Sequence, residues 1–550
     1  MKINWFALNE IKPFDKPEEE KTPKIKEGWL NEAKDYYFSL DDMTEEPYRL
    51  TVTGFTDCEV ELYQLNSTQA HIGRGVTWGE IPQAPEASFY DFLQPFVTQE
   101  ELPTSSSYQL FCLRLTGTAP GKWQGEIRAT QGKISVSKTL TFEVLPLLLP
   151  TQTAPTLELW QYPFAVARYY QIEPKDYFSK AHCERIAESL AHYAEAGGDT
   201  IVTTIVNDPW NHQTYDAYPS LVTWQQSGEK MTFDFTWIDQ YVALCLALGI
   251  NQKIKCFSML PWEDKIYYFD EVDVLQERIY PVNSPQWQEI WRDFLTAFVQ
   301  HLEEKGWFDI TYIAIDERPA ETLASVLQLI KEHPNQEGNL LKVSCALNYQ
   351  SFDHTLLEQI ADLAIGQPHL SDQTVFRQWC EQRRTKGLAT SIYNCVGDYP
   401  AMFLYSHPLE SQWVIWNTVA YGADGFLRWA LDAWVKDPLV NGSHWYWESG
   451  DPFLLYPGTN GTMMSLRFQQ MQQALNDSRK YLFLQNKQPA LVSEVTRLLD
   501  GWAQLSGKTN DYGAQVPFSE NEMLQLIQTI QQMHDLLEKG VRAYLKESNK

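Results

Sequence analysis

The chain has 550 residues, of which 44% are hydrophobic and 21% are charged, and its formal net charge is −27. This balance is typical of a globular protein and excludes a largely disordered chain. The strong negative charge would repel phosphate backbones and anionic membranes, so we expect neither a nucleic-acid partner nor a membrane partner.

Residues 1–150 are predicted to form an antiparallel β-sandwich. Segments with period-two alternation, or rich in β-branched and aromatic residues, follow one another and are separated by turn-like stretches. After about residue 50 no long helical pattern interrupts the series, which favours two packed sheets. The expected strands are residues 48–55, 58–65, 108–117, 123–130 and 134–147.

The start of the chain and its cysteines bear on the compartment. The first residues, MKINWFALNEIKPF, contain no long apolar segment and no small-residue cleavage site, so no signal peptide is expected. The eight cysteines are scattered without a CxxC pair, which favours free thiols in a reducing compartment. We therefore expect a cytoplasmic protein that uses no metal and no cofactor.

Residues 156–435 are predicted to form a (β/α)8 barrel. Strand-like segments alternate with helical ones in about eight units, for example a helix over 284–307 followed by a strand over 311–317. A barrel is the usual product of this alternation. A doubly wound open sheet is the alternative, but no GxGxxG or GxxxxGKS phosphate-binding loop favours it.

Residues 436–550 are predicted to be loop-rich at first and then helical, and to pack on the barrel. Ser519 and Glu522 form a capping box, which marks the start of the last helix. We interpret the apolar face of this helix as packing rather than as a cofactor site. That face consists of Met523, Leu526, Ile527, Ile530, Met533, Leu536 and Leu537.

Polar and aromatic residues follow several predicted barrel strands. The carboxyl ends of the strands carry the functional residues of such barrels, so their recurrence there predicts a pocket. The chain also contains 20 Trp, 28 Tyr and 26 Phe, and aromatic rings suit the C–H faces of sugars. The positions concerned are 207–210, 261–264, 316–317, 393–394 and 428–429.

Two adjacent carboxylic acids, Asp316 and Glu317, end the apolar segment YIAI. One of them could simply cap the next helix, and the other could pair with Arg318. In a poorly hydrated pocket, however, two like charges raise one of the pKa values. A carboxyl that stays protonated near neutral pH can then serve as a general acid. We therefore predict that this pair is catalytic.

Adjacency also selects among glycosidase mechanisms. A retaining enzyme with its own nucleophile needs carboxyls about 5–5.5 Å apart on opposite sides of the scissile bond. Neighbours in sequence share one backbone site and do not flank a sugar in this way. In substrate-assisted hydrolysis the 2-acetamido oxygen of the sugar attacks C1. One carboxyl then protonates the leaving oxygen, while its neighbour orients the acetamide N–H.

Over residues 155–475 the chain resembles glycoside hydrolase family 123, the β-N-acetylgalactosaminidases, and related bacterial proteins. The resemblance implies a β-sandwich followed by a catalytic (β/α)8 barrel. It also implies retaining hydrolysis of terminal β-linked N-acetylgalactosamine through an oxazoline intermediate. It rests on the segments WQYPFAVARYY, TTIVNDPWNHQTYD, FSMLPWED, HLEEKGW, IAIDERP, DGFLRWALDAWVKDPL and GDPFLLYPG.

The resemblance also assigns roles to residues. It implies that Glu317 is the general acid and then the base, and that Asp316 positions the acetamide. Tyr393 best matches the tyrosine that holds the acetamido carbonyl, and Tyr162 stands where the family often carries His. The remaining candidates are Trp429 and Trp262 for a sugar platform or acetamide pocket, and Arg168, Asp208, Trp210 and Asp451 for sugar hydroxyls.

A cytoplasmic member of this family would act on a small soluble glycoside or oligosaccharide. Two alternatives stay open. The protein could be a glycosidase with another sugar preference, such as a β-N-acetylhexosaminidase. It could also be a non-catalytic carbohydrate-binding protein that has kept the barrel and its aromatic residues, although the intact carboxyl pair argues against loss of the site.

Overall fold

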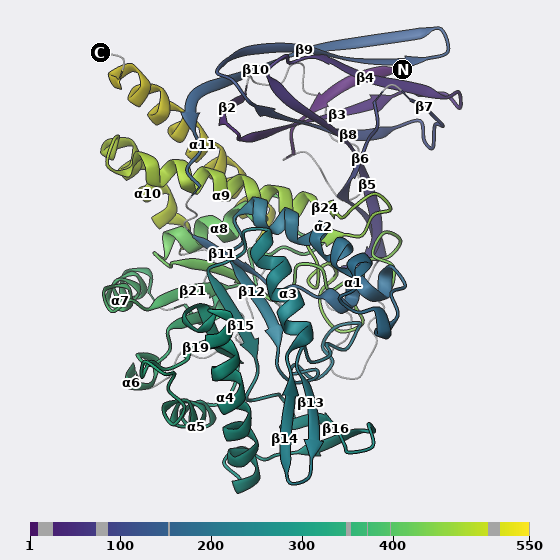
Figure 1. Ribbon diagram of the computed structural model, residues 1–550. Helices are drawn as coiled ribbons and strands as arrows, with labels where there is room; N and C mark the ends of the chain where they lie inside the picture. The colour runs from purple at the N-terminus through teal and green to yellow at the C-terminus, as the bar shows by residue number, and fades with distance from the viewer. Residues whose placement is uncertain are drawn as a thin grey trace.

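The computed structural model describes residues 1–8, 26–72, 86–98, 100–151, 155–347, 354–370, 372–395, 398–503 and 518–548. It consists of an N-terminal β-sandwich, a (β/α)8 barrel and C-terminal helices, which confirms the predicted fold class. In Figure 1 the sandwich lies at the top and the barrel lies below it.

In the residues that the structure describes, the sandwich has ten strands. They are β1 (Lys2–Phe6), β2 (Lys26–Leu30), β3 (Ala33–Asp41), β4 (Tyr48–Gly54), β5 (Cys58–His71), β6 (Glu86–Pro95), β7 (Glu101–Leu102), β8 (Gln109–Gly117), β9 (Gly121–Gln131) and β10 (Ile134–Leu148). Two five-stranded sheets have the orders β1-β3-β8-β5-β6 and β2-β10-β9-β4-β7. Buried side chains of both sheets, among them Phe38, Phe111 and Phe142, form one core.

The barrel contains eight parallel strands in chain order. They are β11 (Thr156–Leu159), β12 (Thr200–Thr204), β15 (Lys253–Phe257), β18 (Thr311–Asp316), β19 (Lys342–Leu347), β20 (Asp362–Gly366), β21 (Ala389–Tyr393) and β22 (Gly425–Arg428). The last strand pairs with the first, and a bridge between Leu157 and Gly198 joins β11 to the start of β12. The sheet is therefore closed, and the doubly wound alternative is wrong.

Helices follow the barrel strands. They are α1 (Pro163–Tyr169), α2 (Lys180–Ala196), α3 (Thr236–Ala247), α4 (Pro285–Lys305), α5 (Ala320–Lys331), α6 (His354–Leu357), α7 (Gln373–Thr385) and α8 (Glu410–Ala420). Local sequence sets their ends, as α4 illustrates. The Ser284 hydroxyl accepts the Trp287 N–H at its start, and Gly306 ends it with a φ of 71°.

A small four-stranded sheet projects from the barrel at the foot of Figure 1. It consists of β13 (Thr223–Ser227), β14 (Lys230–Asp234), β16 (Lys265–Phe269) and β17 (Leu275–Ile279). These strands belong to the loops after β12 and β15. We did not predict them. Each of the two hairpins, β13 with β14 and β16 with β17, is local, and a pairing of Gln225 with Phe269 joins them into one sheet.

The C-terminal helices are α9 (Leu466–Gln485), α10 (Pro489–Ala503) and α11 (Glu520–Ser548), preceded by the short strands β23 (Leu455–Tyr456) and β24 (Met463–Met464). Helix α9 runs between the sandwich and the barrel (Figure 1) and packs on α8. The predicted capping box is present, since the Ser519 N–H donates to Glu522 and the Glu522 N–H donates to the Ser519 hydroxyl. Met533 lies buried in the apolar face of α11, as expected.

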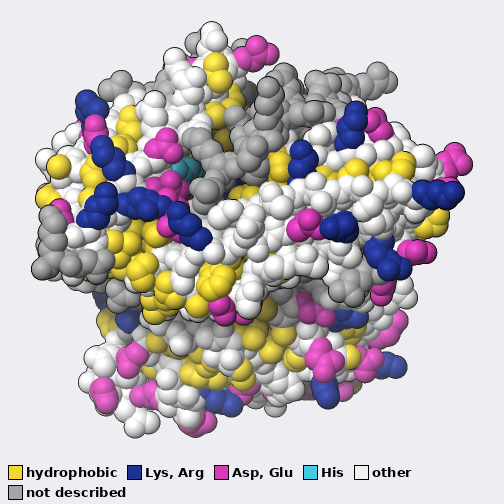
Figure 2. Space-filling model, turned by 90° about the horizontal axis from the view of Figure 1, so that it is seen from above, with side chains coloured by type: hydrophobic (Ala, Val, Ile, Leu, Met, Phe, Trp, Pro, Cys, Tyr) yellow, Lys and Arg dark blue, Asp and Glu magenta, His cyan; other side chains and the backbone are white. Residues whose placement is uncertain are grey.

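Charged side chains of both signs share the face that Figure 2 shows from above, where Lys and Arg gather beside Asp and Glu at one edge. The net charge of −27 therefore does not make this face uniformly acidic. Within the ranges given above, no helix is both long enough and apolar enough to span a lipid bilayer.

The buried ion pair between Asp91 of β6 and Arg467 of α9, 2.8 Å apart, joins the sandwich to the C-terminal helices. Removing the carboxylate in Asp91→Ala leaves a buried guanidinium without its counter-charge. We expect the free energy of unfolding to fall by about 3–5 kcal/mol. Urea denaturation measures this loss.

The matched control is Glu101→Ala, which removes the partner of Arg49 from an exposed pair 3.5 Å apart. We expect a loss of less than about 1 kcal/mol there. Equal losses for the two variants would show that the buried pair does not join the two parts of the molecule.

Candidate active site

A pocket opens at the carboxyl ends of the barrel strands. Its empty volume, counting the part open to solvent, is about 740 Å³. Residues from the ends of β11, β12, β15, β18, β21 and β22 contribute to its wall. The lining residues are Trp160, Tyr162, Asp208, Trp210, Gln213, Thr214, Trp262, Asp316, Glu317, Ala346, Tyr393, Cys395, Leu427, Trp429 and Trp447.

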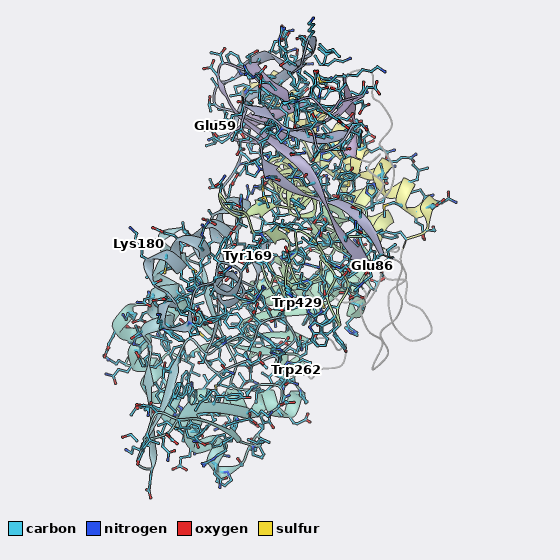
Figure 3. All side chains as sticks on the ribbon, turned by 90° about the vertical axis from the view of Figure 1, so that its right-hand side faces the viewer. Glu59, Glu86, Tyr169, Lys180, Trp262 and Trp429 are labelled. Atoms are coloured by element: carbon cyan, nitrogen blue, oxygen red, sulfur yellow. The ribbon has the colours of Figure 1, made fainter. Side chains whose placement is uncertain are left out.

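Most of the residues predicted from the sequence lie in this pocket. Arg168 and Asp451 are the two that do not line it. Figure 3 labels two of those that do, Trp262 and Trp429, which lie on the same side of the barrel. The predicted residues that line the pocket are Asp208, Trp210, Trp262, Asp316, Glu317, Tyr393 and Trp429.

The two adjacent carboxyls, Asp316 and Glu317, each accept a hydrogen bond from an aromatic side chain. Asp316 ends β18, and its Oδ2 accepts the Trp262 indole N–H at 3.3 Å. The Tyr393 hydroxyl donates to Oε1 of Glu317 at 2.5 Å. The φ of Glu317 is 30°, in the left-handed region that non-glycine residues rarely adopt. Strain of this kind persists where the surroundings hold a residue in place, and it is common at functional sites.

Burial makes both carboxyls hard to ionise. The pKa of Asp316 is raised to about 8, first by burial and then by the neighbouring Glu317. Burial also raises the pKa of Glu317, although the hydrogen bond from Tyr393 acts in the opposite direction and lowers it. The pair therefore keeps a proton near neutral pH, which is what general-acid catalysis requires.

Arg318, the next residue, points away from the acid pair. Its Nη2 lies 2.9 Å from Oδ1 of Asp264, and its Nη1 donates to the Trp262 carbonyl at 2.9 Å. The guanidinium thus joins two loops at the pocket rim. As a cation it opposes the rise in the pKa of Asp316 but does not cancel it.

Trp429 is held from two sides. The Tyr162 hydroxyl donates to the Trp429 carbonyl at 3.0 Å, and the Trp429 indole N–H donates to Oδ2 of Asp451 at 3.2 Å. Asp451 is fully buried and also pairs with Arg428 at 2.5 Å. The expected contact between Asp451 and a sugar hydroxyl is therefore not available, because this carboxylate lies behind the pocket wall and positions Trp429.

Arg168 lies outside the pocket lining as well. Its Nε donates to the Asp216 carboxylate at 2.8 Å, and its Nη2 donates to the Trp434 carbonyl at 2.7 Å. These bonds tie α1 to the loops after β12 and β22. The guanidinium carries a structural ion pair where the sequence predicted a sugar ligand.

The predicted set omitted several residues of the wall. Trp160 comes directly after β11, so the strand-end rule could have identified it, and it stacks on Trp210 with ring centroids 5.2 Å apart. The Trp210 indole N–H has no hydrogen-bond partner among the described residues, which leaves a buried donor for a ligand. Gln213 and Trp447 lie in long loops, where no periodic pattern marks a residue as functional.

The pocket has an acidic and aromatic character. Asp208, Asp316 and Glu317 line it, whereas no Lys or Arg is among its described lining residues. The guanidinium groups of Arg168, Arg318 and Arg428 are each paired with an aspartate that does not line the pocket. In the part of the chain that the structure describes, no group of three or more His, Cys, Asp or Glu is placed to hold a metal ion.

A closed (β/α)8 barrel whose aromatic pocket contains two adjacent buried carboxyls has the groups that a glycoside hydrolase needs. A model of the family "Glycoside hydrolase 123, catalytic domain" matches residues 160–484. Because this match covers more than half of the chain, the protein belongs to glycoside hydrolase family 123.

A solved structure of a family 123 glycoside hydrolase from Clostridium perfringens, described for glycolipid glycan hydrolysis, is similar to this chain. The sequence identity is 29%, the TM-score is 0.86, and the match covers 95% of this chain and 94% of that one. A search of curated proteins found no match.

Two other solved structures are only distantly similar. The endo-β1,6-glucanase BT3312 has 12% identity and a TM-score of 0.38, over 59% of this chain and 77% of that chain. SrfJ from Salmonella typhimurium has 11% identity and a TM-score of 0.37, over 62% and 81%. Likeness at this level carries no information about the substrate.

The hydrogen bond from Trp262 favours the carboxylate form of Asp316 and so lowers its pKa. We expect Trp262→Phe to raise the pKa of Asp316 above about 8. The carboxyl-carbon chemical shift of ¹³C-labelled aspartate, assigned by its loss in Asp316→Asn, follows the titration.

Trp445→Phe is the control, since Trp445 is 54% exposed and does not line the pocket. It should leave the titration unchanged. An unchanged or lowered pKa in Trp262→Phe would contradict the assigned hydrogen bond.

Proposed function

We propose that this family 123 glycoside hydrolase removes terminal β-linked N-acetylgalactosamine from small soluble glycosides with retention of configuration. The observation that carries the proposal is the adjacent, buried pair Asp316 and Glu317, whose pKa values are both raised. A pair on one strand end suits substrate-assisted hydrolysis, because both carboxyls approach the sugar from the same side.

In the proposed reaction the acetamide supplies the nucleophile. Its carbonyl oxygen bonds to C1 as the bond from C1 to the leaving oxygen breaks, and Glu317 transfers its proton to that oxygen. The product is a cyclic oxazolinium ion. Water then gives a proton to Glu317 and attacks C1, which reopens the ring and restores the β configuration.

Asp316 and Tyr393 would position the acetamide. An acetamide N–H that donates to Asp316 favours its carboxylate form, which leaves the shared proton on Glu317. The same carboxylate balances the positive charge of the oxazolinium ion. Without a ligand the Tyr393 hydroxyl donates to Glu317, and we propose that it turns to the acetamido carbonyl when substrate binds.

The walls of the pocket favour an uncharged sugar. Trp429 and Trp262 offer ring faces for the C–H groups of a pyranose, while Asp208 and the Trp210 indole N–H offer an acceptor and a donor for hydroxyls. A sulfate or a uronate would meet three carboxyls and no cation in this lining. We therefore propose that the enzyme accepts neutral sugars and rejects acidic ones.

The preference for the galacto configuration rests on the resemblance to the β-N-acetylgalactosaminidases of family 123. A β-N-acetylhexosaminidase of other preference is the nearest alternative. A purely carbohydrate-binding role is disfavoured, because a lectin gains nothing from keeping two carboxyls buried without a cation.

A panel of aryl glycosides tests the proposed substrate. We expect hydrolysis of aryl β-GalNAc, slower hydrolysis of aryl β-GlcNAc, and none of aryl β-galactoside, which lacks the acetamide. The 6-sulfated β-GalNAc should react at least about tenfold more slowly than the neutral sugar, because its charge faces only carboxyls. Equal rates on β-GalNAc and β-galactoside would exclude participation by the acetamide.

Variants of the acid pair test the roles. Glu317→Gln should lower kcat by about 10²–10⁴ on substrates with poor leaving groups, because the general acid is lost. Asp316→Asn should lower kcat by about 10²–10³, because the acetamide loses its charged partner. Steady-state kinetics measures both losses.

Asp208→Asn is the matched control for these variants, since it removes a third pocket carboxyl that we assign to binding. It should raise KM more than it lowers kcat. A loss of kcat in Asp208→Asn as large as that in Asp316→Asn would favour an enzyme nucleophile instead. The melting temperature of Asp316→Asn should not fall, because the replacement removes a carboxyl whose ionisation is disfavoured by burial.

A further inference from the structure

We propose that the N-terminal β-sandwich is part of the catalytic apparatus, because its β5–β6 hairpin positions Trp447, which forms a wall of the substrate pocket. This inference rests on the proposed function only for its kinetic test. The contacts that carry it run from the sandwich to the pocket in four steps.

The first step is the length of β5. Only its first part, Cys58 to Leu65, pairs with β8 inside the sandwich. From Asn66 to His71 the strand pairs only with β6 in that sheet, and it extends beyond the sandwich core. Figure 3 shows the consequence, since Glu59 lies in the sandwich whereas Glu86, the first residue of β6, lies near the height of Trp429 in the barrel.

The second step is the pairing of this extension with the loop between β22 and α9. The Gln69 N–H donates to the Val440 carbonyl at 3.1 Å, and the Gly442 N–H donates to the Gln69 carbonyl at 2.8 Å. A parallel bridge between Gln69 and Asn441 results. This loop thus pairs with the edge of β5 that β8 leaves uncovered beyond Leu65.

The third step is a set of bonds around His71, the last residue of β5. The His71 N–H donates to the Ser443 hydroxyl at 3.0 Å, and the Ser449 hydroxyl donates to the His71 carbonyl at 2.8 Å. The His71 ring Nε2 lies 3.2 Å from the His444 carbonyl, so it must carry the proton and donate. The loop from 443 to 449 is therefore held at both of its ends by one sandwich residue.

The fourth step leads from His444 to the pocket. The buried His444 ring accepts the backbone N–H groups of Tyr446 and Trp447 at Nδ1, at 3.0 and 2.9 Å. Burial lowers the pKa of His444 to about 3, so Nδ1 stays an acceptor under any working condition. A turn built in this way fixes where the Trp447 side chain begins.

The Trp447 ring then completes the pocket wall. Its indole N–H donates to the Gln213 carbonyl in the loop after β12 at 3.0 Å, and its ring meets Trp429 edge to face at 6.1 Å. Trp447 thereby closes the gap between the β12 loop and the β22 loop. Its ring offers a further face for the C–H groups of a sugar.

A double-mutant cycle tests whether His71 acts through Trp447. We expect His71→Ala to raise KM for the aryl glycoside roughly fivefold or more with a smaller change in kcat, because the wall is less well ordered. Trp447→Ala should raise KM further. If His71 acts through Trp447, the double variant should match Trp447→Ala alone. Effects that multiply, or a KM unchanged in His71→Ala, would overturn the proposal.

Two further variants distinguish a loss of the positioning of Trp447 from a general loss of stability. His71→Gln keeps an N–H donor at a similar reach and should restore most of the KM. Gln94→Ala changes an exposed residue of β6 whose side chain accepts a hydrogen bond from Asn66 within the sandwich, and it should leave KM unchanged.

The positioning of Trp447 can also be tested without substrate, so that the result does not depend on the proposed function. Hydrogen–deuterium exchange of the Tyr446 and Trp447 amides should be faster in His71→Ala than in the unmodified protein and in Gln94→Ala. Faster exchange without glycoside hydrolysis would overturn the proposed function and leave the positioning role standing. Unchanged exchange would overturn the positioning role itself.

Discussion

The site depends on keeping two adjacent carboxyls, Asp316 and Glu317, in a place where neither ionises easily. Burial raises both pKa values, and the neighbouring Glu317 adds to the rise for Asp316. The backbone of Glu317 also adopts a φ that non-glycine residues rarely adopt. Such an arrangement persists only if the surrounding fold is stable enough to hold it. The buried strand β18 on one side, and Tyr393 and Trp262 on the other, provide that support.

Arginines near the pocket are directed away from Asp316 and Glu317 by ion pairs with other residues. Arg318, although it follows the acids in sequence, forms its ion pair with Asp264, and Arg428 is neutralised behind the wall by Asp451. A guanidinium beside Glu317 would hold that carboxyl ionised and so remove the proposed general acid. The same distribution of charge leaves the pocket acidic and aromatic, which suits a neutral sugar and a transition state that gains positive charge.

The three parts of the chain are joined by buried polar contacts rather than by linkers alone. Asp91 and Arg467 join the sandwich to α9, and His71 joins it to the loop that carries Trp447. Separating the buried ion pair would leave a charge without its partner, which is strongly destabilising. These contacts make the sandwich a support of the pocket wall.

The sequence by itself determined the sandwich, the barrel and the acid pair, because each depends on local patterns: alternation, helical periodicity and two carboxyls at the end of an apolar strand. Only the tertiary structure decided which other residues reach the pocket. Arg168 and Asp451 have the right chemistry for sugar ligands, but their ion pairs with Asp216 and Arg428 turn them away. Trp447 shows no pattern of its own. It is placed by its hydrogen bond to Gln213 and by His444, which accepts the Trp447 N–H and is itself bonded by His71. Side-chain direction in a loop follows from such long-range contacts, which no local pattern encodes.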